Sequence, residues 1–171
     1  MNLSPLSTIL FLALLGVAVW AFGMVGAAWW STRRVPALGL AAPGELSACP
    51  DTPNCVSSQA TESDQRHWIA PLPAGSGSVA EQRSRVLAGL EAAFGDRVSP
   101  VDSPGFDEQG YGRWVVRTPT LGFVDDLELL HDAEAGVFHV RSASRVGGGD
   151  GGANRKRVEA LTAVLETMPA E

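Results

Sequence analysis

The sequence has 171 residues, of which 45% are hydrophobic and 19% charged, and a net charge of −6. All 19 acids lie at or after Glu45, whereas two of the 13 bases, Arg33 and Arg34, precede it; the remaining 11 bases leave this later part at −8. Such an excess of acids argues against a nucleic-acid partner, because duplex binding depends largely on neutralising phosphates. Beyond its apolar start, the chain suits one domain of ordinary size.

Residues 1–34 are predicted to form a membrane anchor. No charged residue lies from Ile9 to Trp30, and 22 residues at 1.5 Å each make a helix of about 33 Å, enough to cross a bilayer's hydrocarbon layer. Trp29 and Trp30 match the aromatic belt at membrane interfaces. A cleaved signal peptide is the alternative, because residues 25–27 offer small side chains for cleavage, although no basic segment precedes the apolar run.

Two features predict opposite orientations for this anchor. Arg33 and Arg34 favour a cytoplasmic domain by the positive-inside rule. Cys49 and Cys55, in Cys-Pro-Asp-Thr-Pro-Asn-Cys, favour a small disulfide loop worth about 2–3 kcal/mol and an oxidising compartment. The alternative is two reduced thiols; a metal site is disfavoured because zinc takes four ligands and no second pair follows. We predict a single-pass membrane protein with its domain on the periplasmic side.

Residues 35–47 are interpreted as a linker, and residues 48–171 as the domain. The first predicted strand is His67 to Ala70, ended by Pro71 and Pro73. A helix should follow, because Ser78 and Glu81 have capping-box spacing, apolar residues then recur at helical intervals, and Gly95 ends the pattern.

Four more strands are predicted near residues 97–101, 113–118, 123–131 and 137–145, separated by turns rich in Gly, Pro and Asp. A last helix should begin with Asn154 as its cap and run to Met168. The order of elements predicts an α+β fold, in which two amphipathic helices lie on one face of an antiparallel sheet of about five strands.

The two strands 123–131 and 137–145 carry charged side chains. If their apolar faces coincide, alternation places Asp126 and Glu128 beside His139 and Arg141 on the opposite face. This set is interpreted as a solvent-exposed charge ladder. Asp125 shares the apolar face instead, where an unpaired carboxylate is costly, so it needs a partner such as Ser142 or Ser144.

Residues 141–157 are basic and rich in glycine. Glycines let a backbone approach a ligand, and the helix after them offers free N–H groups. Bases at 155–157 oppose the dipole of that helix, which is understandable if an anion lies there. A phosphate, sulfate or carboxylate ligand or a protein partner would satisfy the site, as would internal Asp125 or Asp126. The candidate ligand-binding residues are Arg141, Arg145, Asn154, Arg155 and Arg157.

Motifs for known chemistry are incomplete. Gly147, Gly149 and Gly152 match G-x-G-x-x-G, but no strand follows the last helix. The segment lacks the Gly-Lys-Ser/Thr of a P-loop, and no nucleophile elbow surrounds Ser142 or Ser144. The three histidines are too scattered to predict a metal site. We therefore predict no metal and no cofactor.

Several stretches resemble the domain-of-unknown-function family numbered 1499, found in bacteria and plastids. They are 49–59 (Cys-Pro-Asp-Thr-Pro-Asn-Cys-Val-Ser-Ser-Gln), 123–128 (Phe-Val-Asp-Asp-Leu-Glu) and 139–147 (His-Val-Arg-Ser-Ala-Ser-Arg-Val-Gly), continued by Asp150, Gly152, Asn154, Arg155 and Arg157. The resemblance spans roughly residues 46–166. It implies a shared fold, an N-terminal membrane or export segment and an envelope or lumenal setting, but no established reaction. The loop 148–151 is more glycine-rich than the family pattern.

Three functions remain open. The favoured one is a membrane-tethered binding or accessory domain whose arginines engage an anionic molecule or a protein partner. The second is a structural envelope protein without a ligand. The third is an enzyme in which Asp125 or Asp126 acts as acid or base beside His139. The sequence leaves the oligomeric state and the ligand open.

Overall fold

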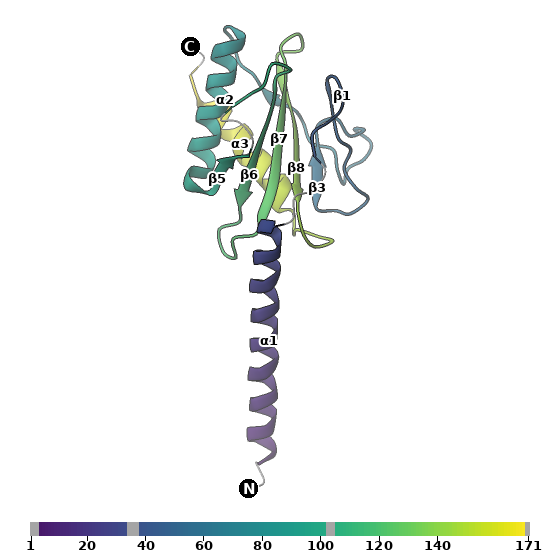
Figure 1. Ribbon diagram of the computed structural model, residues 1–171, viewed down its shortest axis with the longest axis vertical. Helices are drawn as coiled ribbons and strands as arrows, with labels where there is room; N and C mark the ends of the chain where they lie inside the picture. Colours follow the sequence, from purple (N-terminus) through teal and green to yellow (C-terminus); the bar gives the residue numbers. More distant parts are fainter. Residues whose placement is uncertain (1–3, 34–37, 102–104, 170–171) are drawn as a thin grey trace.

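The computed structural model consists of a long N-terminal helix and one α+β domain (Figure 1). It describes residues 4–33, 38–101 and 105–169. The elements, in chain order, are α1 (Pro5–Arg33), β1 (Leu40–Ala42), β2 (Glu45–Leu46), β3 (Cys55–Ser57), β4 (Leu72–Pro73), α2 (Val79–Phe94), the 3₁₀ helix η1 (Gly95–Arg97), β5 (Val98–Pro100), β6 (Tyr111–Arg117), β7 (Val124–Asp132), β8 (Val137–Ser144) and α3 (Ala153–Thr167).

Helix α1 is apolar around its whole circumference for most of its length. Its most apolar window has a mean hydropathy of 2.4 and is 0% buried, so it is long and apolar enough to cross a membrane. A signal sequence has the same properties. The predicted span Ile9 to Trp30 falls inside α1. At its end, the Arg33 guanidinium lies 3.7 Å from the ring centre of Trp29, whereas Arg34 is outside the described residues.

The main sheet is antiparallel and has the order β3-β8-β7-β6-β5, with β4 also paired to β8. The two α-helices of the domain, α2 and α3, lie on one face of this sheet (Figure 1), which confirms the predicted fold class. The hairpin of β7 and β8 pairs Asp125 with Ser144 at one end and Asp132 with Val137 at the other. Its turn uses Gly136 at φ 68°, a conformation that favours glycine.

The core lies between the sheet and the two helices. Alternate residues of the central hairpin and one stripe of α3 are fully buried there: Leu127, Leu129, Phe138, Val140, Val158, Leu161 and Leu165. Gly89 of α2 is also buried, and a Cβ added to it would lie 2.7 Å from Cδ2 of Leu165. A glycine at this position therefore lets α2 and α3 approach closely.

The N-terminal boundary of α2 is as predicted. Ser78 is its N-cap and accepts a hydrogen bond from the Glu81 backbone N–H, while the Glu81 carboxylate accepts from the Ser78 N–H at 2.6 Å. This reciprocal pair satisfies two N–H groups that the helix itself cannot. The helix ends at Phe94, and Gly95 follows at φ 56°.

Strands β5 to β8 confirm four predicted strands, but the first predicted strand is wrong. His67 to Ala70 makes only an isolated parallel bridge, between Trp68 and Ser57. The strands at this edge are β3, which begins at the last residue of the cysteine motif, and β4, which contains Pro73. Proline lacks an N–H but is tolerated at a sheet edge, so its presence here did not exclude a strand.

The segment interpreted as a linker, 35–47, is described from residue 38 onward. Its described part forms the antiparallel pair β1–β2. Leu46 is only 3% exposed, and the Gly39 N–H donates to Oε1 of Glu128 at 2.8 Å. Residues 38–47 thus pack against the outer face of the sheet, the face opposite α2 and α3.

Candidate functional site

The first group of predicted site residues lies between the sheet and α3, and we call Asp125, Ser142, Asn154 and Arg157 the helix-face cluster. Arg157 donates from Nη2 to the Asp125 carboxylate, and from Nη1 to Ser142 Oγ at 2.9 Å and Asn154 Oδ1 at 2.5 Å. Asp125 is 3% exposed. Burial raises the pKa of Asp125, and the charge of Arg157 and a hydrogen bond with Ser144 oppose that rise. Asp125 thus has the predicted serine partner, Ser144, and in addition an arginine, Arg157.

The N-terminus of α3 differs from its prediction. The N-cap is Gly152, at φ 81°, and Asn154 lies inside the first turn. Asn154 is fully buried and donates to the Asn54 carbonyl and to Ser144 Oγ, each at 2.9 Å. The capping prediction for Asn154 is wrong because its amide is needed to join α3 to β8 and to the cysteine loop.

An internal carboxylate occupies the start of α3. Asp150 accepts from the Gly152 N–H at 2.9 Å and from the Asn154 N–H at 2.8 Å. Burial raises the pKa of Asp150, but the hydrogen bonds from Asn154 and Gly152 outweigh it, so that its pKa lies below the ordinary value. The anion that the basic first turn of α3 calls for is therefore supplied in part by the chain itself.

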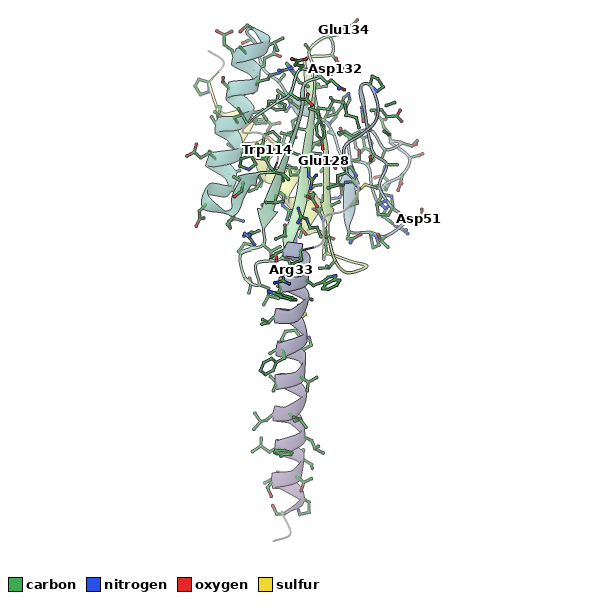
Figure 2. The ribbon with its side chains drawn as sticks, viewed as in Figure 1. Arg33, Asp51, Trp114, Glu128, Asp132 and Glu134 are labelled. Atoms are coloured by element: carbon green, nitrogen blue, oxygen red, sulfur yellow. A yellow bond between two sulfur atoms is a disulfide. The ribbon has the colours of Figure 1, made fainter. Side chains whose placement is uncertain are left out.

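On the outer face of the sheet, the cross-strand charges form a buried ladder. Arg141 Nη1 lies 2.8 Å from Glu128 Oε2, and Arg145 makes two hydrogen bonds of 2.8 Å with Asp126. Asp126 is 1% exposed and Glu128 is 0% exposed, and Figure 2 places Glu128 near the middle of the domain. The predicted solvent exposure is wrong. Gly39 and Tyr111 each donate to Glu128 at 2.8 Å, and Arg145, the partner of Asp126, also donates to the Ser31 carbonyl of α1.

Arg155 and His139 lie apart from both groups. Arg155 Nη2 donates to the carbonyls of residues 65, 66 and 68, at 3.3, 3.3 and 2.8 Å. His139 contacts Ser58 at 3.3 Å and Asp132 at 3.8 Å, and Figure 2 shows Asp132 at the end of the domain remote from α1. His139 pairs with Leu130, five residues along β7 from Asp125, or about 17 Å. The structure therefore does not bring His139 together with Asp125 or Asp126.

The disulfide between Cys49 and Cys55 is present, and disulfides are typical of extracytoplasmic proteins. His67 lies beside this loop, with Nδ1 at 2.7 Å from Asp64 Oδ2 and Nε2 at 3.2 Å from the Thr52 carbonyl. Over the ranges 4–33, 38–101 and 105–169, the structure contains no group of three or more His, Cys, Asp or Glu residues arranged to hold a metal ion.

Helix α1 contacts the domain through one face of its last three turns, which we call the docking face: Met24, Ala27, Ala28 and Ser31. These positions are partly or fully buried, while their neighbours are exposed, and their spacing puts them on one side of the helix. Ser31 is 0% exposed; its Oγ accepts from the Val124 N–H at 3.0 Å, and its carbonyl accepts from Arg145 Nη1 at 3.4 Å. The start of β7 is thereby fixed to the helix.

A cavity of about 380 Å³ lies where the docking face meets the domain. Two loops, 118–123 and 145–152, reach this end of the domain beside α1 (Figure 1), and we call this end the base. The cavity is lined by Met24, Ala27, Thr118, Phe123, Asp125, Ser144, Val146, Gly147, Gly149, Asp150 and Ala153. No local sequence pattern predicted this cavity, because its walls come from three segments that are distant in the chain. Two of the stretches that resemble the family, 123–128 and 139–147, both contribute residues to it.

The comparison with protein families identifies the chain. Residues 45–165 match the family described as protein of unknown function (DUF1499), and because the match covers well over half of the chain, the protein belongs to this family. No curated protein and no solved structure matches it.

Proposed function

We propose that this member of the family of unknown function 1499 is a single-pass, membrane-anchored accessory domain of the cell envelope. Its base lies in the extracytoplasmic interface of the membrane. The apolar helix α1 supports the anchor, and the disulfide between Cys49 and Cys55 supports an oxidising compartment.

The observation that carries this proposal is the docking of α1 onto the domain. A domain tethered by a free linker would not need contacts with its anchor, yet Ser31 is fully buried against β7. An anchor that ends in the domain's own hydrogen-bond network fixes the position of the base relative to the bilayer. Leu121, in loop 118–123, is 38% exposed, which suits contact with lipid.

The arginines support a structural role in this domain better than an arginine-lined anion site. Arg141, Arg145 and Arg157 each have a carboxylate partner within the domain, and Arg155 has three backbone carbonyls. Breaking a buried pair leaves an uncompensated charge, which is strongly unfavourable. An anionic ligand would therefore have to displace partners that the fold itself requires.

Thiol labelling in intact cells tests the proposal, because it reports the compartment and the disulfide together. We expect Cys49 and Cys55 to react only after treatment with a reductant that does not cross the membrane, and the protein to stay in the membrane after an alkaline carbonate wash. Free thiols that react only after permeabilisation would place the domain in the cytoplasm. Release by the wash would show that α1 is removed as a signal sequence.

A further inference from the structure

The cavity at the base lies at the depth of the lipid acyl chains when α1 spans a membrane. Trp29 and Trp30 are exposed and mark the interface by the preference of tryptophan for the headgroup region. Met24 lies five residues before Trp29, about 8 Å deeper along the helix axis. The wall that Met24 contributes therefore lies at the depth of the acyl chains, and Ala27 lies nearer the headgroups.

The lining of the cavity is mainly apolar on its accessible side. Met24, Ala27, Phe123 and Val146 contribute carbon surface from α1 and from both loops of the base. Val146 and Phe123 are only partly buried by the protein itself. Covering such surface is favourable in proportion to its apolar area.

The polar groups of the lining already have partners. Asp125 is held by Arg157, and the Asp150 carboxylate accepts from the first N–H groups of α3. Neither carboxylate needs a ligand, and both disfavour a phosphate inside the cavity because like charges repel. An occupant is therefore uncharged within the cavity and is held by its apolar part.

We propose that the cavity at the base binds an acyl chain of a membrane lipid. A volume of about 380 Å³ falls in the range of small-molecule sites, roughly 300–1,000 Å³. The inference rests on the proposed membrane anchor, since only a bilayer would present acyl chains to this wall. The lipid then completes the contact between α1 and the loops 118–123 and 145–152, and its headgroup stays outside.

Photocrosslinking tests this site in the full-length protein reconstituted in vesicles of phosphatidylcholine that carry a diazirine at the end of one acyl chain. We expect adducts on peptides from 118–123 and 144–153, besides adducts on the lipid-exposed faces of α1. Ala27→Trp fills the cavity and should reduce the adducts on the two loops several-fold. The matched control is Val25→Trp, because Val25 lies at a similar depth, is 64% exposed and points away from the docking face.

The possible results distinguish a failure of the proposed lipid site from a failure of the proposed membrane anchor. Adducts on α1 alone, unchanged by Ala27→Trp, would overturn the lipid site and leave the anchor intact, whereas an absence of adducts on α1 would refute the anchor. Because Ala27→Trp also alters the docking face, Val146→Trp fills the cavity from the domain side and should give the same loss. Crosslinks from the loops to another protein instead of lipid would overturn the proposal as well.

Discussion

The pair formed by Asp125 and Arg157 gives the sharpest prediction about the arginines. Arg157→Met keeps the length of the side chain but leaves the Asp125 carboxylate, 3% exposed, without its cation. Removing one partner of a buried pair costs about 3–5 kcal/mol. Asp125 limits the loss by taking up a proton: from an ordinary pKa of 3.8, neutralisation at pH 7 costs about 4 kcal/mol at 1.36 kcal/mol per unit. The two estimates of the lost stability agree.

Urea unfolding of the full-length protein in detergent measures this loss. The matched control is Lys156→Met, since Lys156 is exposed in the same turn of α3 and its loss should change stability by less than about 0.5 kcal/mol. The deficit of Arg157→Met should shrink towards pH 5, because a carboxyl with a raised pKa favours the folded state as pH falls. An effect of Arg157→Met equal to that of Lys156→Met would refute a structural role and restore the ligand-binding interpretation.

Three further predictions concern other parts of the domain. Gly89→Ala should destabilise the protein by roughly 1–3 kcal/mol despite its higher helix propensity, because its Cβ would overpack against Leu165; an increase in melting temperature would contradict the close α2–α3 contact. Burial, with the nearby charge of Arg83, lowers the pKa of His131 from 6.5. Its stabilising contribution should thus be complete above pH 6.5 and decline below it, and thermal melts of His131→Gln should lack this component. Replacing both Cys49 and Cys55 by Ala should cost about 2 kcal/mol in urea unfolding, and an unchanged midpoint would show that the loop needs no covalent closure.

Local patterns predicted the helices and the long strands well. The capping box of Ser78 and Glu81 and the alternation in β7 and β8 are set by neighbours in the chain, so periodicity reveals them. The edge strands β3 and β4 have two or three residues each. They exist because β8 offers a free edge, and no local pattern contains that information.

The sequence predicted which residues belong to the candidate site, but not which of them contact one another. Sequence alone placed Asp125 on the apolar face and allowed an internal carboxylate as the partner of the basic segment, and Arg157 fulfils that alternative. It did not reveal that Asp126 and Glu128 are buried, because the contacts on this face come from far earlier in the chain. Gly39 donates to Glu128, and Ser31 accepts from Arg145, the partner of Asp126. The docking face was hidden as well, since Ser31 acquires its partners only when β7 begins beside α1.

The most direct test of the membrane-seated base is the depth of a nitroxide label on loop 118–123 in reconstituted vesicles. Leu121→Cys and Val79→Cys, both exposed in the domain, can each be labelled selectively because the native cysteines are bonded to each other. We expect oxygen to reach a label at position 121 readily and a water-soluble relaxation agent to reach it poorly, whereas a label at position 79 should show the reverse. Equal, fully aqueous accessibility at both positions would contradict the seating of the base on the membrane.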